Sequence, residues 1–145
     1  MYGGAVLSCS VGMRARVTVA PAPGLALETE GQERRIAGRD DLRLQGDCFD
    51  VARAALDELQ LPALECRVRY GSEIPLRSGM AGSTALVVAL LRALSLWMGK
   101  DWANPYQLAE RARHVEHRLY HPSDVLPLVV CGDDHQLLHP RLSRR

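Results

Sequence analysis

The sequence has little of what marks several classes of protein. Aromatic residues make up only 5% of its 145 residues, which argues against a surface that stacks nucleic-acid bases. Lys and Arg (18) nearly balance Asp and Glu (17), so no charge excess draws the chain to nucleic acid or to an anionic membrane. With 47% hydrophobic and 24% charged residues, the composition is instead that of a soluble globular domain.

The four cysteines form no CxxC pair, so the spacings of zinc and redox motifs are missing. Each lies in an apolar stretch, where we expect a buried thiol that acts as a small hydrophobic side chain. The longest apolar run, residues 84–97, contains Arg92 and is shorter than the ~20 residues that span a bilayer. No signal peptide is indicated, and we therefore expect a cytoplasmic protein.

The first third of the chain predicts strands. Residues 14–20 alternate between polar and apolar side chains, and residues 25–29 suggest a strand that returns after the break at 21–24. We expect residues 32–45 to form a loop with at most one edge strand. Residues 64–70 alternate again, which predicts a half-buried strand that pairs with the earlier ones.

Apolar residues at helical spacing predict three helices. The first runs from 47 to about 60, and the second, 83–98, has Arg92 as its only charged residue, so we expect protein nearly all around it. Asn104 and Pro105 predict the N-cap and first turn of a third helix that ends near residue 119. Strands followed by helices on one face predict a two-layer α+β sandwich.

The segment that suggests chemistry joins the last predicted strand to the second helix and reads Pro75-Leu76-Arg77-Ser78-Gly79-Met80-Ala81-Gly82-Ser83-Thr84-Ala85. It is neither a Walker loop nor a GxGxxG fingerprint, but its small residues let the backbone pass close to a ligand. The helix start offers free N–H groups to an anion, and its two hydroxyls can bond to phosphate or coordinate a phosphate-bound cation. On glycine content alone, a simple tight connection is the favoured interpretation.

The whole segment, however, resembles the phosphate-binding loop of the GHMP kinases, the family of galactokinase, homoserine kinase and mevalonate kinase. The family motif runs Pro-x-x-x-Gly-Leu-Gly/Ala-Ser/Gly-Ser-Ser/Thr-Ala, and Met80 stands here in place of its usual leucine. Residues 2–8 and the helix at 86–94 also resemble the corresponding family segments, so the resemblance covers roughly residues 2–119. It is closest to the sugar and heptose-phosphate kinase branch.

The resemblance implies the N-terminal ATP-binding domain of a kinase, of the ribosomal S5 domain 2-like type, over residues 1–119. Residues 120–145 are then a divergent segment that can form a hairpin and a basic tail. The implied nucleotide-binding residues are Arg77, Ser78, Gly79, Met80, Ala81, Gly82, Ser83 and Thr84. The family also implies Mg²⁺ beside the ATP phosphates, held by a serine of this loop, here Ser83, and by a helix glutamate.

Glu116 is the glutamate that fits this metal role best. The buried stripe of the third helix is expected to consist of Leu108, Ala112, Val115 and Leu119. Glu116 lies at the margin of that stripe, whereas Glu110 lies on the far side in water. A carboxylate at the margin needs a partner, which a phosphate-bound Mg²⁺ would supply. A salt bridge to a neighbouring arginine is the alternative, and we favour the metal role.

The sequence departs from the family pattern at both ends. It starts after the strand and loop that contact the phosphoryl acceptor, and the C-terminal half of the kinase is missing. No Gly-x-x-x-Asp-Gln-like stretch with a catalytic aspartate follows Glu116, and Asp124 is too close to it to align, so the catalytic residue is unknown. We therefore expect a truncated kinase in which weak ATP binding survives while turnover on a sugar or sugar phosphate is lost or very low.

Two other classes of function stay open. The third helix presents a polar face that can bind zinc, although a solvated histidine face is commoner; its residues are Glu110, His114, His117 and His121. The other class is a non-catalytic nucleotide-binding or protein-interaction module, because an incomplete kinase would expose apolar surface and self-associate through it. The near-neutral charge argues against RNA as the partner.

Overall fold

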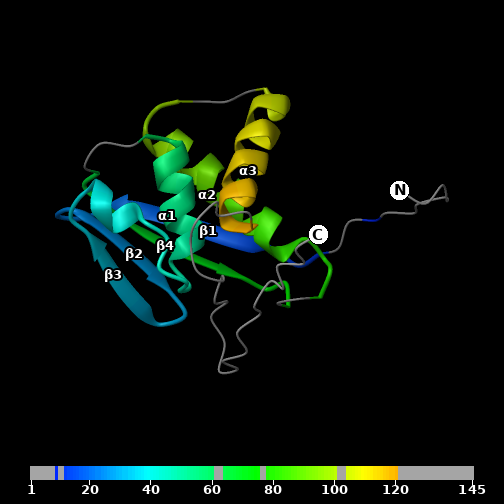
Figure 1. The fold of residues 1–145 in the computed structure, drawn as a ribbon, viewed down its shortest axis with the longest axis horizontal. Helices are drawn as coiled ribbons and strands as arrows, with labels where there is room; N and C mark the ends of the chain where they lie inside the picture. Colours follow the sequence, from blue (N-terminus) through cyan, green and yellow to red (C-terminus); the bar gives the residue numbers. More distant parts are fainter. Residues whose placement is uncertain (1–8, 10–11, 61–63, 76–77, 101–103, 121–145) are drawn as a thin grey trace, which may run out of the picture.

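The computed structural model describes residues 9, 12–60, 64–75, 78–100 and 104–120. These residues form a four-stranded sheet and three α-helices (Figure 1). In chain order the elements are β1 (Ala15–Pro21), β2 (Leu25–Thr29), β3 (Gln32–Ile36), the short 3₁₀ helix η1 (Arg39–Leu42), α1 (Asp50–Glu58), β4 (Cys66–Ser72), α2 (Gly82–Trp97) and α3 (Pro105–Tyr120). No helix within this described part is long and apolar enough to cross a membrane.

The sheet has the strand order β1-β4-β2-β3, with β4 antiparallel to β1 and parallel to β2. The prediction that β4 pairs with the earlier strands is confirmed, since Val68 lies opposite both Val19 and Leu27. The strand predicted at residues 25–29 is present as β2, and β4 lies between it and β1. β4 is an inner strand with Cys66, Val68 and Tyr70 buried on its inward face, whereas the inward residues of the edge strand β1 are half-buried or exposed.

The three helices lie on one side of the sheet (Figure 1). α2 packs against β1 and β4, and α3 packs against α1 and α2. The core between these elements includes Leu27, Leu56, Val68, Leu90 and Leu94, all 0–1% exposed. The other face of the sheet carries exposed ion pairs, among them Arg69–Glu28 at 2.9 Å and Arg16–Glu73 at 2.7 Å. The predicted two-layer α+β sandwich is therefore confirmed.

The end of α2 and the start of α3 lie at the predicted capping residues, whereas α1 begins three residues later than predicted. Asn104 Oδ1 accepts a hydrogen bond from the Tyr106 N–H at 2.9 Å and caps α3, as expected. Gly99 follows α2 with φ +68°, a conformation that glycine adopts at little cost. α1 begins at Asp50 rather than at Asp47, because the Asp47 carboxylate accepts from the Phe49 N–H at 2.9 Å and forms a turn ahead of the helix.

The expectation that α2 is surrounded by protein fails at its last turn. Leu96 is 53% exposed and Trp97 is 39% exposed. The buried face of α2 instead contains Val87, Leu90 and Leu94. At 100° per residue, Leu96 points about 200° away from Leu94 and therefore away from the sheet.

A buried charged cluster that the sequence did not suggest leads into α1. We call Asp47, Asp50 and Arg53 the Arg53 cluster. The Arg53 side chain is 0% exposed, and its Nη1 donates to Asp47 Oδ1 and Asp50 Oδ1, both at 2.6 Å. Asp50 also accepts from the N–H groups of Gln45 (2.9 Å) and Gly46 (2.7 Å). Burial lowers the pKa of Arg53, but the hydrogen bonds to Asp47 and Asp50 outweigh it and leave that pKa raised.

The cysteines only partly follow the expectation of buried thiols. Cys66 in β4 is fully buried, and burial raises the pKa of its thiol. Cys48 is half-buried, and Cys9 is exposed, so for Cys9 the expectation is wrong. An apolar neighbourhood in the sequence does not bury a side chain unless an element of the fold packs over it. Cys131 lies outside the described residues.

Candidate functional site at the start of α2

The backbone that leads into α2 is bent by two residues with positive φ. Gly79 has φ +73°, and Ala81, the N-cap of α2, has φ +56°. Ser78 Oγ accepts a hydrogen bond from the Met80 N–H at 3.3 Å within the same bend. A left-handed conformation costs an L-residue such as alanine roughly 1–2 kcal/mol, so the loop holds a strained backbone just before the helix.

Gly82 lets the first turn of α2 approach the end of β4. A Cβ atom added there would lie 3.2 Å from Cγ2 of Ile74, which is itself buried. A side chain at this position would therefore require Ile74 to shift by a few tenths of an ångström. Glycine allows the close approach without that shift.

Two hydroxyl groups in this first turn face the last turn of α3. Thr84 Oγ1 donates a hydrogen bond to Glu116 Oε1 at 2.5 Å, and Tyr120 OH donates to Ser83 Oγ at 2.7 Å. Ser83, Thr84 and Glu116 are half-buried, and Tyr120 is 49% exposed. The fold thus brings together groups that lie more than 30 positions apart in the sequence.

The electrostatics of this corner suit a phosphate group with a divalent cation. The first N–H groups of a helix have no partner within it, and the N-cap residue of α2, Ala81, makes no side-chain hydrogen bond to them. Their positive dipole end favours an anion, while hydroxyl and carboxylate oxygens are the ligands that Mg²⁺ prefers. Among the described residues, no group of three or more His, Cys, Asp and Glu side chains could hold a metal ion. A cation bound here would therefore share its coordination with phosphate oxygens, as Mg²⁺ commonly does.

The structure places most of the predicted site residues in one corner. Residues 78–84 form the bend and the first turn of α2, and Arg77 lies outside the described residues. Among described residues, the partner of Glu116 is Thr84 rather than an arginine. The hydroxyl of Ser83, the predicted metal ligand, contacts Tyr120 instead. Sequence reasoning missed Tyr120, although it lies four positions after Glu116 and hence on the same face of α3.

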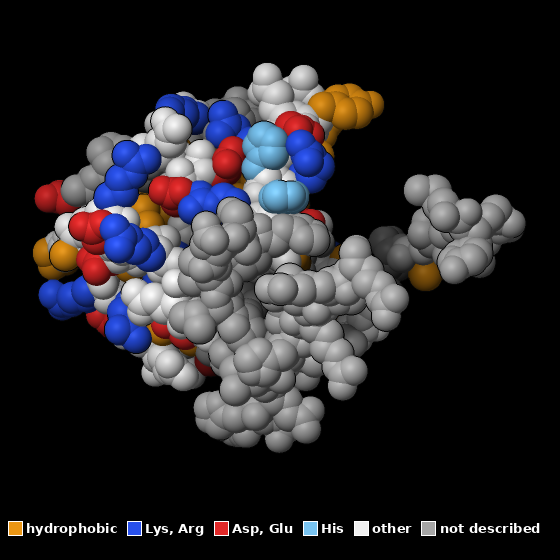
Figure 2. All heavy atoms as spheres, in the orientation of Figure 1, with side chains coloured by type: hydrophobic (Ala, Val, Ile, Leu, Met, Phe, Trp, Pro, Cys, Tyr) orange, Lys and Arg blue, Asp and Glu red, His pale blue; other side chains and the backbone are white. Residues whose placement is uncertain are grey.

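The histidine face of α3 gains no support as a metal site. His114 lies 3.3 Å from a carboxylate oxygen of Glu110 and 3.7 Å from one of Glu58. Histidine side chains gather over α3 among acidic and basic ones (Figure 2). His121 lies outside the described residues. In the part of α3 that the structure describes, these side chains form a polar face with mixed charges.

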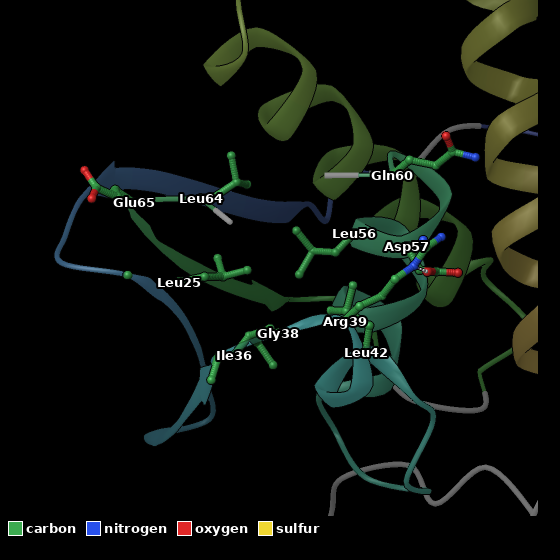
Figure 3. A pocket seen from close by; sticks show the side chains of 12 residues that line it. Leu25, Ile36, Gly38, Arg39, Leu42, Leu56, Asp57, Gln60, Leu64 and Glu65 are labelled. Carbon is green, nitrogen blue, oxygen red and sulfur yellow. Dashed lines mark ion pairs between the residues drawn. The ribbon is translucent and has the colours of Figure 1, made fainter. Parts of the chain in front are cut away.

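A cavity of about 780 Å³ lies away from the start of α2. It opens between α1, η1 and the β2–β3 hairpin, and Leu25, Ile36 and Leu56 extend toward it (Figure 3). At its rim, Arg39 Nε lies 4.0 Å from Asp57 Oδ1. None of the described site residues lines this cavity, so its size alone does not mark it as the nucleotide site.

Comparison with known proteins supports the family suggested by the loop. The family model for the GHMP kinases N-terminal domain matches residues 47–132, more than half of the chain. The match extends past residue 119, where we placed a domain boundary. A homoserine kinase from Sulfurovum sp. (strain NBC37-1) is 24% identical over 128 residues, which is 87% of this chain and 41% of that kinase. The chain thus spans less than half the length of this relative.

Solved structures with a similar fold are also kinases of this kind. The mevalonate kinase of Methanococcus jannaschii matches with a TM-score of 0.58 and 16% identity, over 71% of this chain and 35% of that one. A D-glycero-D-manno-heptose 1-phosphate kinase from Bacteriodes thetaiotaomicron matches with a TM-score of 0.52 and 13% identity, over 72% and 35%. At identities this low, the structural similarity shows only that the fold is shared. The match to the family model shows the family relationship. The chain belongs to the GHMP kinase family and contains its N-terminal domain.

Proposed function

We propose that this chain supplies the ATP-phosphate-binding half of a GHMP-type kinase that phosphorylates an alcohol group of a sugar or sugar phosphate. The observation that carries the proposal is the contact between Thr84 Oγ1 and Glu116 Oε1 at the start of α2, where the N-cap residue Ala81 makes no side-chain hydrogen bond. It joins a carboxylate to a helix end that favours anions, a combination that a phosphate-bound cation would stabilise. The family relationship supports ATP as the source of the phosphates.

In this proposal each residue of the corner has a separate task. The N–H groups of residues 82–84 and the hydroxyl of Ser83 donate hydrogen bonds to phosphate oxygens. Glu116 and Ser83 would together hold Mg²⁺. The hydrogen bond from Thr84 already orients the Glu116 carboxylate. The ion would neutralise the charge that develops during phosphoryl transfer. The bend at 78–81 brings the backbone close enough to contact the phosphates.

In this proposal the chain provides the nucleotide side of the active site but not the full binding site for the phosphoryl acceptor. The matching kinases are longer, since the chain covers only 35–41% of those compared. Phosphoryl transfer needs the acceptor and the nucleotide to be positioned together. We therefore expect ATP binding but little or no turnover by these 145 residues alone. Robust phosphorylation of a sugar or sugar phosphate by the purified chain would contradict this expectation.

The first test is calorimetric titration with ATP in the presence and absence of Mg²⁺. We expect wild-type binding to require Mg²⁺ and to weaken at least about tenfold in the double variant Ser83→Ala, Thr84→Ala, which loses two hydrogen-bonding groups at a charged ligand. Thr18→Ala is the matched control, because it removes an exposed hydroxyl from β1 on the far face of the sheet. If the folded wild-type chain binds no ATP, a non-catalytic interaction module becomes the better interpretation.

A further inference from the structure

Tyr120 makes a contact that the family motif does not include. It is the last residue of α3, and its hydroxyl donates a hydrogen bond to Ser83 Oγ at 2.7 Å. The residue is 49% exposed and does not belong to the hydrophobic core. A half-exposed tyrosine whose hydroxyl reaches the first turn of another helix has little value for packing.

The direction of this hydrogen bond determines what Ser83 can offer a ligand. A serine hydroxyl has one O–H to donate and two lone pairs to accept with. With Tyr120 as the donor, the contact occupies one lone pair of Ser83 and leaves the Ser83 O–H and the second lone pair for a ligand. A phosphate oxygen can accept from that O–H, and the second lone pair can coordinate a cation. The contact also restricts rotation of the Ser83 side chain, which would otherwise lose that freedom when a ligand binds.

Glu116 and Tyr120 hold the two hydroxyls of α2 from one face of α3. They are four residues apart, so both side chains point to the same side of the helix. Glu116 accepts from Thr84 while Tyr120 donates to Ser83, and the last turn of α3 thus orients neighbouring hydroxyls in opposite hydrogen-bonding senses. This arrangement leaves Ser83, rather than Thr84, with a hydroxyl proton to donate to a ligand.

We propose that Tyr120 is a positioning residue of the phosphate site, which orients the Ser83 hydroxyl toward ATP and its Mg²⁺. This inference rests on the proposed function, since it assigns Tyr120 a role in the same site. Tyr120 itself does not contact the phosphates in this proposal and acts only through Ser83. Removing its hydroxyl therefore weakens binding only as long as Ser83 has its own.

The test is a double-mutant cycle on the full chain with Tyr120→Phe and Ser83→Ala, read by calorimetric titration with Mg²⁺ and ATP. We expect Tyr120→Phe to weaken binding about three- to tenfold, the effect of one hydrogen bond. We expect the double variant to bind no more weakly than Ser83→Ala alone. Tyr106→Phe is the matched control, because it removes a hydroxyl from the same helix at a ring that is 83% exposed.

Two other outcomes would contradict the positioning role alone, and a third would contradict the proposed function as well. If Ser83→Ala weakens binding and Tyr120→Phe does not, the site is real but Tyr120 does not position it. If the two losses add, Tyr120 acts by a route other than Ser83, and the positioning role is again wrong. Absence of Mg²⁺·ATP binding by the folded wild-type chain overturns the proposed function and this role with it. A thermal melt without ATP shows whether Tyr120→Phe merely unfolds the chain, and we expect its midpoint to match the wild type.

Discussion

The Arg53 cluster and the start of α2 are both polar, but they differ in how their hydrogen bonds are used. In the Arg53 cluster, an arginine that is 0% exposed lies between two aspartates, and Asp50 also accepts from two backbone N–H groups. At the start of α2, each half-buried hydroxyl contacts a side chain of α3, and the N-cap residue Ala81 makes no side-chain hydrogen bond to the helix. In the Arg53 cluster the opposite charges pair with one another, although Arg53 Nε has no hydrogen-bond partner among the described residues, whereas we expect the start of α2 to offer donors and acceptors to a ligand.

The backbone shows the same contrast. Where the chain leads into α1, the residue with positive φ is Gly46 (φ +77°), which pays little for it. Before α2, the corresponding conformation is adopted by Ala81 (φ +56°), for which it is unfavourable. Strain of this kind is commonly retained at functional sites. We therefore expect the Arg53 cluster to serve stability and the start of α2 to serve binding, and three substitutions test this expectation.

The largest effect is expected from Arg53→Met. Methionine replaces the aliphatic part of the arginine side chain but removes the guanidinium, which leaves the buried Asp50 without its cation. Breaking a buried ion pair in this way costs about 3–5 kcal/mol of unfolding free energy. Urea denaturation measures it. The control Arg69→Met breaks an exposed pair with Glu28 and should cost less than about 1 kcal/mol. Similar losses in both variants would contradict the assigned role of the Arg53 cluster.

A smaller and different effect is expected from Glu116→Gln. The amide oxygen can still accept from Thr84, so the free energy of unfolding should change by less than about 1 kcal/mol. The charge is lost, however, and titration should show Mg²⁺·ATP binding weakened about tenfold or more, as expected when a charged partner is removed. Glu110→Gln, on the exposed side of the same helix, should bind like the wild type. A large loss of stability with unchanged binding would show that Glu116 serves stability and not binding.

The smallest effect is expected from Ala81→Gly. Glycine adopts φ +56° without steric cost, so the variant should be more stable by up to about 1 kcal/mol in urea denaturation. Ala93→Gly, inside α2, should instead be less stable by roughly 0.5–1 kcal/mol. Opposite signs for the same chemical change would confirm strain at the N-cap. Loss of stability in both variants would show that Ala81 carries none.

Local sequence patterns predicted which helices and strands form better than they predicted which of these elements lie side by side. The alternation at 14–20 and 64–70 identified β1 and β4, and the Asn104–Pro105 signal placed the start of α3. The order of the sheet was not predictable in this way, because alternation shows that a strand has a buried face and does not say which strand lies beside it. Burial of Arg53 was missed for a related reason: an arginine in the sequence suggests solvent until its two aspartates are placed around it.

The candidate site divides along the same line. The small residues and hydroxyls at 78–84 were evident from the sequence, because a helix that begins after a glycine-rich bend has a known local geometry. Helical spacing also placed Glu116 at the edge of the buried face of α3, where the structure finds it half-buried. Which hydroxyl meets Glu116, and that Tyr120 meets Ser83, could not be predicted, since both contacts depend on how two separate helices cross.

By itself, the sequence determined the class of the protein: strands and helices of a two-layer α+β domain, and a phosphate-loop motif shared with the GHMP kinases. These follow from short-range rules, in which side-chain period, capping and small residues act within a few positions of one another. Only the tertiary structure decided that β4 is central, that Arg53 is enclosed, and that the end of α3 holds the hydroxyls of α2. Those outcomes depend on packing between distant segments, whose geometry no local pattern contains.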